Sequence, residues 1–101
     1  ETNWGTLDGL PTVVPALLNL GLAGQPYVTH DIAGFAKGTP GTKELFQRWT
    51  ELGAFTPIMR THEGADRDNN WSWKSDAETT AHFRRFVFVH CALRDEFATL
   101  A

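Results

Sequence analysis

The amino-acid sequence predicts an α/β fold that corresponds to roughly a quarter of a closed (β/α)8 TIM barrel. Helical and strand-like segments alternate along the 101 residues. The link between the two predicted strands has the length of a crossover connection, so the strands should be parallel. Two strands leave two unpaired edges, whereas parallel sheets need several strands and cover on both faces. We therefore expect residues 1–101 to be one partial barrel domain that needs the remainder of the barrel for a stable sheet.

The first predicted helix runs from Leu10 to Leu22 and is apolar nearly all round, which predicts packing on more than one side. Thr12 is the expected N-cap, and it places Pro15 in the first turn, where a missing N–H is tolerated. The first strand is predicted at Pro26–Thr29, and a loop rich in glycine and proline follows at 33–41.

The second predicted helix begins after Thr42, its N-cap, and continues through Leu52 with apolar residues at helical spacing. Gly53 is the expected C′ residue that ends it. The second strand is predicted at 54–59. Pro57 lacks an N–H for the hydrogen-bond ladder, so this strand should be short or irregular.

A polar loop at 64–74 precedes the third predicted helix. Ser75 as N-cap and Glu78 at position N3 match the capping-box pattern. The apolar periodicity then predicts a long helix to about Leu93, with a continuation toward Leu100 left open.

The composition excludes several classes of function. The formal net charge is −3 and no basic patch is present, so we expect no nucleic-acid partner. No apolar run approaches the roughly 18–20 residues of a membrane span, so we expect no membrane partner. The single cysteine, Cys91, is predicted to be a small buried side chain. Glu1 opens the chain where an initiator Met is absent, so we expect a longer chain, called here the parent polypeptide.

Two polar clusters share one position in the predicted topology. The pair His30–Asp31 and the run Arg60–Glu63 each come directly after a predicted strand. In a parallel barrel this end of the strands carries the active site. We expect functional roles for Asp31 and Arg60 and a structural role for His30.

The functional trio of Asp31, Arg60 and His62 combines an ionised acceptor, a fixed donor fork and a group that can donate or accept. That combination suits the hydroxyl groups of a carbohydrate. An apolar platform for the sugar would come from the nearby aromatic residues Phe35, Trp71 and Trp73.

A metal-dependent barrel hydrolase is a second interpretation of the same residues. His30, Asp31, His62 and Glu63 are all possible ligands for a divalent ion. Their spacing matches no compact metal-binding signature. We therefore expect neither a metal nor another cofactor.

Three segments resemble glycoside hydrolase family 31, the α-glucosidase family. They read LGLAG at 20–24, HDIAGF at 30–35 and GAFTPIMRTH at 53–62, and the resemblance extends from about Trp4 to at least Leu93. The resemblance implies a (β/α)8 barrel of which this chain supplies the last two βα units.

The resemblance also implies retaining catalysis by two aspartates without a metal. One acts as nucleophile and the other as general acid/base, with carboxyl groups about 5–5.5 Å apart. Both are expected upstream of Glu1, the acid/base in a Gly-Asp pair immediately before it. No catalytic residue is therefore expected in these 101 residues, which alone should be inactive.

The resemblance assigns substrate-binding roles to residues that match the family motifs. Asp31 matches a sugar-binding carboxylate of the first subsite, and His62 matches a hydroxyl-binding histidine. Phe35 matches an aromatic residue beside the leaving-group subsite, and Arg60 matches an arginine that supports the carboxylates. Ala33 departs from the family pattern, in which a glycine precedes Gly34.

A sulfoquinovosidase-like subgroup of the family is resembled at 59–64, at Asn70–Trp71 and at 76–79. Those enzymes cleave α-linked sulfoquinovose and carry a tyrosine at the position of Phe35, where it helps to bind the sulfonate. The missing hydroxyl at Phe35 favours a neutral α-glucoside over a sulfoquinovoside. A non-catalytic structural fragment remains the alternative from another class, and the compartment is left open.

Overall fold

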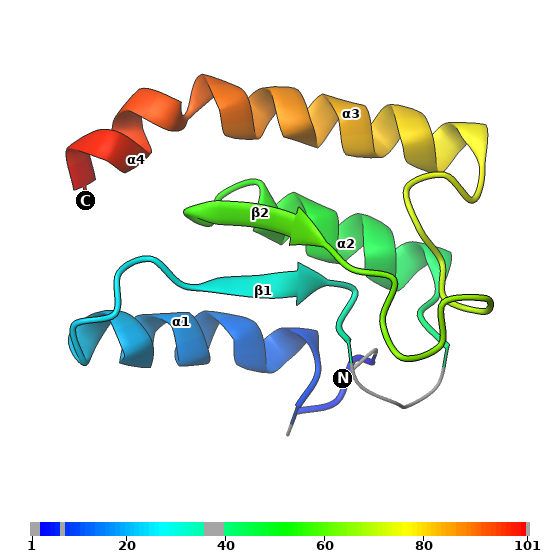
Figure 1. Cartoon of the computed structure of the whole chain (residues 1–101), viewed down its shortest axis with the longest axis horizontal. Helices are drawn as coiled ribbons and strands as arrows, with labels where there is room; N and C mark the ends of the chain where they lie inside the picture. The colour runs from blue at the N-terminus through cyan, green and yellow to red at the C-terminus, as the bar shows by residue number, and fades with distance from the viewer. Residues whose placement is uncertain (1–2, 7, 36–39, 101) are drawn as a thin grey trace.

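The structure is a computed structural model, and it describes residues 3–6, 8–35 and 40–100. Its sheet contains two parallel strands, β1 (Thr29–Ile32) and β2 (Ile58–Thr61), paired in register from Thr29 opposite Ile58 to Ile32 opposite Thr61. Helix α2 (Lys43–Gly53) connects the strands and packs on one face of the sheet (Figure 1). The predicted parallel pair with a helical crossover is confirmed. Two strands do not close a barrel.

The remaining helices flank this unit. A short 3-10 turn η1 (Leu10–Thr12) leads into α1 (Val13–Leu22), and α3 (Ala77–Ala92) packs on α2. The predicted end of the third helix at about Leu93 is confirmed, and the separate helix α4 (Arg94–Leu100) occupies the stretch toward Leu100 that the prediction left open. Figure 1 shows α1 beside β1 and α3 beside β2, while no described helix covers the sheet face opposite α2.

β1 lies three residues later than predicted, at 29–32 in place of 26–29, and β2 begins four residues later and ends two later, at 58–61 in place of 54–59. The end of α2 explains the later start of β2. The N–H of Phe55 donates to the carbonyl of Leu52, and that of Thr56 donates to Gly53. Pro57 has no N–H, so the ladder of β2 begins directly after it.

The core lies between α2 and the sheet and contains Val13, Ile32, Ala33, Leu45, Phe46 and Trp49. Gly53 was expected as a left-handed C′ residue, but it is the last residue of α2 and the following Ala54 has φ −61°. A Cβ atom at Gly53 would lie 2.9 Å from Cδ1 of Ile32, which is 1% exposed. Glycine at 53 therefore permits the close approach of α2 to β1.

The helix N-termini confirm one predicted cap and correct another. The hydroxyl of Thr42 accepts from the N–H of Leu45 at 3.2 Å, as predicted. The N-cap of α3 is Asp76, whose Oδ1 accepts from the N–H of Thr79 at 2.7 Å. Ser75 instead accepts from the N–H of Ser72. Asp76 caps the helix through Oδ1 while its Oδ2 accepts from Lys43 Nζ at 2.7 Å.

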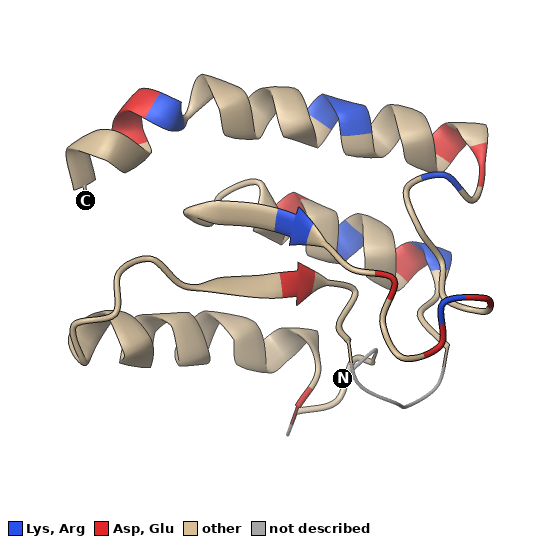
Figure 2. Cartoon of the chain, viewed as in Figure 1, with Lys and Arg blue, Asp and Glu red and all other residues tan. Residues whose placement is uncertain are grey.

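Several apolar surfaces are uncovered in these residues. Helix α1 carries no charged side chain (Figure 2), yet Leu18 is 65% and Leu22 89% exposed, and Val13 is its buried residue. Packing of this helix on several sides is not seen within these residues and stays a prediction. Cys91 is also exposed instead of buried. Among the described helices, none is long and apolar enough to cross a membrane.

Candidate functional site

Asp31 and Arg60 lie opposite each other on the two strands, one residue before the end of each. His30 and Ile32, on either side of Asp31 in β1, face α2, so the alternation of side chains places Asp31 on the opposite face of the sheet. Arg60 lies on that same face, because it forms an ion pair with Asp31. Arg60 Nε lies 2.6 Å from Asp31 Oδ1. Both residues were predicted just past the strand ends, and the structure places them inside the strands.

His62 follows the end of β2 on the same face as Arg60, because the two residues are separated by one position. Its Nδ1 accepts from the N–H of Gly64 at 3.0 Å, so a neutral ring carries its proton on Nε2. The ring of Phe35 contacts the His62 ring edge-on, with centroids 4.8 Å apart. Four predicted site residues, Asp31, Phe35, Arg60 and His62, are thus brought together.

The turn after β1 uses two residues in the left-handed region. Ala33 has φ +70° and Gly34 has φ +83°. A glycine adopts this conformation without cost, whereas an alanine there is strained. Ala33 is nevertheless buried in the core, and the Gly34 N–H donates to the Asp31 carbonyl at 2.7 Å. The turn therefore ties Phe35 to the strand that carries Asp31.

The loop after β2 is fastened to the loop after β1. The Gly41 N–H donates to Asn70 Oδ1 at 2.9 Å, and Asn70 Nδ2 donates to the Glu63 carbonyl at 3.1 Å. The N–H of Ala65 donates to the carbonyl of Phe35 at 2.9 Å. The sequence analysis noted Asn70 only as part of the subgroup resemblance and did not predict that it organises the site, because its partners lie in other loops.

His30 has structural partners, in agreement with its expected role. Trp49 Nε1 donates to His30 Nδ1 at 2.8 Å, which fastens β1 to α2. Burial lowers the pKa of His30, and the nearby charge of Asp31 opposes this effect in part. The ring is therefore held neutral in the interface behind Asp31.

The two tryptophans of the predicted platform point elsewhere. Trp71 packs against the core, and its Nε1 donates to the hydroxyl of Thr79 at 3.0 Å. Trp73 stacks with Phe83, with centroids 6.5 Å apart and an angle of 22° between planes. Phe35 is the predicted platform residue whose ring lies beside His62.

The metal interpretation finds no support in the described part of the chain. Within it, no group of three or more His, Cys, Asp or Glu side chains could hold a metal ion. His30 faces α2 while Asp31 and His62 lie on the opposite sheet face, so the suggested ligands do not converge.

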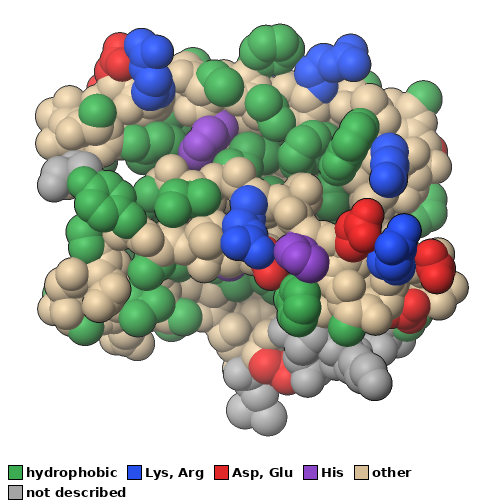
Figure 3. Space-filling model, viewed as in Figure 1, with side chains coloured by type: hydrophobic (Ala, Val, Ile, Leu, Met, Phe, Trp, Pro, Cys, Tyr) green, Lys and Arg blue, Asp and Glu red, His purple; other side chains and the backbone are tan. Residues whose placement is uncertain are grey.

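The two ends of the strands differ in chemistry. An apolar hollow of about 600 Å3 lies near the strand starts, lined in part by Tyr27, Phe55 and Phe97. A polar cavity of about 200 Å3 lies past the strand ends and is lined by His62 and by residues of the following loop. In Figure 3, charged and histidine side chains gather over this second end. The candidate site therefore lies at the carboxyl ends of the strands, where parallel α/β proteins bind ligands.

Comparisons with a family model and with individual proteins point to the same family. Residues 1–100 match the family model described as the glycosyl hydrolases family 31 TIM-barrel domain. A sulfoquinovosidase of Escherichia coli (strain K12) is 44% identical over 96 residues, which cover 93% of this chain and 14% of that enzyme. A lysosomal alpha-glucosidase of Rattus norvegicus is 48% identical over 59 residues, 58% of this chain and 6% of that enzyme.

A solved structure extends the comparison to three dimensions. It is a family 31 sulfoquinovosidase from E. rectale in complex with the aza-sugar inhibitor IFGSQ. The superposition has a TM-score of 0.87 at 38% identity and covers 94% of this chain and 14% of that chain. The resemblance noted in the sequence is thereby confirmed, and the chain spans a small part of the relatives it matches.

Proposed function

This chain belongs to glycosyl hydrolase family 31, and from that premise we propose that the parent polypeptide is a retaining α-glycosidase acting on terminal α-linked sugars. Residues 1–101 supply part of its sugar-binding pocket. The observation that carries the proposal is the cluster of Asp31, Phe35, Arg60 and His62 at the carboxyl ends of β1 and β2. The proposal is also supported by two sulfoquinovosidases of the family, whose similarity to this chain covers 93% and 94% of it.

Each member of the cluster has a distinct role. The Arg60 contact involves Oδ1 of Asp31, so the second carboxylate oxygen can accept from a sugar hydroxyl. His62 donates to another hydroxyl through Nε2, because Gly64 occupies Nδ1. Phe35 supplies an apolar surface beside His62. Small-ligand sites usually combine a few polar groups that orient the ligand with aromatic side chains that cover one of its sides.

The chemistry itself is assigned to two aspartates of the parent polypeptide upstream of Glu1. One would attack the anomeric carbon while the other protonates the leaving oxygen, and water would then release the sugar with retained configuration. We therefore expect the 101 residues alone to be inactive. The specific feature to look for is a Gly-Asp pair directly before Glu1.

The test is hydrolysis of p-nitrophenyl α-glucoside by the parent polypeptide, followed by NMR of the first sugar anomer released. The proposal expects release of the α-anomer. A polypeptide that contains both aspartates but cleaves no α-glycoside would overturn it. A native chain of 101 residues, measured by mass, would favour the structural-fragment alternative instead.

A sulfoquinovoside is the second candidate substrate. It is favoured by the names of the relatives that match nearly the whole chain. Phe35 favours the neutral glucoside, because its ring lacks the hydroxyl that the subgroup places near the sulfonate. The ratio of kcat/KM for p-nitrophenyl α-sulfoquinovoside to that for p-nitrophenyl α-glucoside separates the two candidates.

A further inference from the structure

The segment 63–65, directly after His62, joins the two loops of the candidate site. Its consecutive N–H groups have different acceptors. That of Gly64 donates to His62 Nδ1 at 3.0 Å, and that of Ala65 donates to the Phe35 carbonyl at 2.9 Å. Two neighbouring peptide groups thus bind a side chain of their own loop and the backbone of the loop after β1. A displacement of this segment would therefore change both contacts at once.

Gly64 makes this arrangement possible. Its φ of +72° lies in the left-handed region, which glycine adopts without the cost that a side chain imposes. A Cβ atom at this position would lie 2.8 Å from Asn70 Nδ2 and 3.2 Å from the Phe35 carbonyl oxygen. The backbone at Gly64 is therefore enclosed between the Asn70 side chain and the turn after β1.

The Asn70 side chain fixes the peptide group that precedes Gly64. Its Nδ2 donates to the Glu63 carbonyl at 3.1 Å, while its Oδ1 accepts from the Gly41 N–H at 2.9 Å. The Glu63 carbonyl and the Gly64 N–H belong to one planar peptide group and point in opposite directions. A side chain that holds the carbonyl on one side therefore sets the direction of the N–H on the other.

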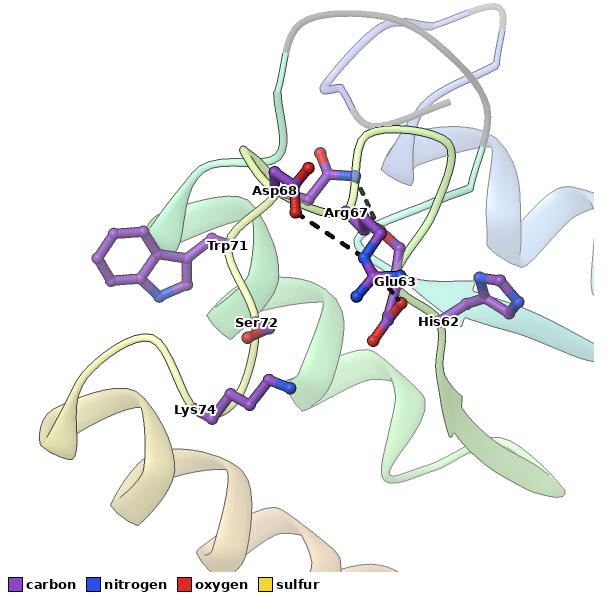
Figure 4. A pocket seen from close by; sticks show the side chains of 8 residues that line it. His62, Glu63, Arg67, Asp68, Trp71, Ser72 and Lys74 are labelled. Carbon is purple, nitrogen blue, oxygen red and sulfur yellow. Dashed lines mark hydrogen bonds and ion pairs between the residues drawn. The ribbon is translucent and has the colours of Figure 1, made fainter.

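The direction of that N–H determines which nitrogen of His62 carries the proton. An N–H that donates to Nδ1 requires a lone pair there, so the neutral ring has its proton on Nε2 and offers a donor to a sugar hydroxyl. In Figure 4 the His62 ring points away from Trp71, and Glu63 lies between the two residues. Asn70, which precedes Trp71, therefore acts on the ring through the peptide group after Glu63.

We propose that Asn70 is a positioning residue that fixes His62 as a hydrogen-bond donor to the sugar, acting through the peptide group that precedes Gly64. The Asn70 amide holds the carbonyl of that group, and the N–H of the same group holds His62 Nδ1. Without the amide, the peptide group can rotate and both tautomers of His62 become accessible. This inference rests on the proposed α-glycosidase function and adds a residue on which its donor histidine depends.

The spectroscopic test is 15N NMR of the parent polypeptide labelled at histidine, at about pH 9, where an ordinary imidazole is neutral. The His62 signals are identified by their loss in His62→Gln. In the unmodified protein, Nδ1 should have the chemical shift of an unprotonated nitrogen and Nε2 that of a protonated one. In Asn70→Ala, both shifts should move toward the mean of the two tautomers. Equal shifts in the two proteins, or a proton on Nδ1 in the unmodified protein, would overturn the inference.

A double-mutant cycle measures whether Asn70 acts through His62. Asn70→Ala should lower kcat/KM on the best α-glycoside by about fivefold in the unmodified protein, the range of one lost hydrogen bond, but by less than about twofold in the His62→Ala background. Equal losses in both backgrounds would overturn the coupling. Asn69→Ala is the matched control, because this exposed neighbour donates to Asp66 Oδ1 within the same loop. It should leave kcat/KM and the His62 shifts unchanged.

Asn70→Asp is the second variant, because it retains an acceptor for the Gly41 N–H but has no donor for the Glu63 carbonyl. It should move the His62 shifts as Asn70→Ala does, and unchanged shifts in this variant would also overturn the inference. A parent polypeptide that shows the expected shifts but cleaves no α-glycoside would overturn the proposed function. The sugar would then be excluded as the partner of His62, while the control of the ring by Asn70 would be supported.

Discussion

Asp31 Oδ1 and Arg60 Nε are 2.6 Å apart across the parallel strand pair, one residue before each strand ends. The side chain of Asp31 is 18% exposed and that of Arg60 48% exposed. The guanidinium therefore holds a largely shielded carboxylate in a fixed orientation while its own outer side still faces solvent. A sugar-binding carboxylate needs this kind of preorganisation, because its direction determines which hydroxyl it can accept from.

Removal of the Arg60 guanidinium tests that relationship. Arg60→Ala in the parent polypeptide should lower kcat/KM on its best α-glycoside by about ten- to a hundredfold, or ~1.4–2.8 kcal/mol, because Asp31 loses its orienting partner. Arg60→Lys should be intermediate, since lysine offers a point charge without the planar fork. Arg48→Ala, which removes an exposed arginine paired with Glu51 on α2, should leave kcat/KM unchanged. A loss below about threefold for Arg60→Ala would contradict the positioning role.

Phe35 should determine how the site treats a sulfonated sugar. In Phe35→Tyr the added hydroxyl should raise kcat/KM for an α-sulfoquinovoside relative to the α-glucoside by about threefold or more, the range of one hydrogen bond. Phe88→Tyr is the matched control, because Phe88 is 68% exposed on α3. An unchanged substrate ratio in Phe35→Tyr would remove Phe35 as a determinant of specificity.

Gly53 should be intolerant of a side chain, because its Cβ position lies 2.9 Å from Cδ1 of buried Ile32. Gly53→Ala should lower the free energy of unfolding by about 1–3 kcal/mol through overpacking. Gly21→Ala offers the opposite case, since nothing lies within 4 Å of its Cβ position in α1. That change should stabilise by about 0.5–1 kcal/mol. Equal effects in denaturant unfolding of the parent polypeptide would contradict the close approach of α2 to β1.

Acid should weaken the junction between α2 and α3. The hydrogen bond from Lys43, together with that from the Thr79 N–H, lowers the pKa of Asp76 from 3.8 to about 2. Because the folded-state pKa lies below the unfolded value, the stabilisation is complete above about pH 4 and disappears as the pH falls toward 2.

Asp76→Asn separates this charge effect from capping, because asparagine is also a good N-cap. The variant should have a lower Tm at neutral pH and a shallower fall of Tm between about pH 4 and pH 2. Glu44→Gln, at an exposed position of α2, is the control. A parallel Tm–pH curve for Asp76→Asn and the unmodified protein would show that the Lys43 pair contributes nothing.

The fold was predictable where a local pattern and the tertiary structure agree. The apolar spacing in α2 and the cap at Thr42 identify that helix, and the crossover length gives a parallel pair. The strand limits were not predictable. Tyr27 and Val28 have high β propensity but precede β1, whereas polar His30 and Asp31 lie within it, because pairing with β2 decides which residues form the ladder.

The candidate site was predictable as a set of residues but not as a geometry. The motifs identify Asp31, Arg60 and His62, while their contacts depend on strand register and on the loop fastened by Asn70. The apolar surroundings of Cys91 and α1 in the sequence indicate burial, and their exposure within these residues agrees with the expectation of a partial barrel. The roles of the site residues stay predictions until a substrate is tested.

His62→Ala tests the central claim most directly, because His62 lines both the sugar site and the adjacent cavity. In the parent polypeptide, kcat/KM on the best α-glycoside should fall by more than about tenfold, since a buried sugar hydroxyl would lose its partner. His82→Ala, which removes a histidine paired with Glu51 on the opposite side of α2, should leave kcat/KM unchanged. A loss below about threefold for His62→Ala would contradict the assignment of this segment to the sugar-binding pocket.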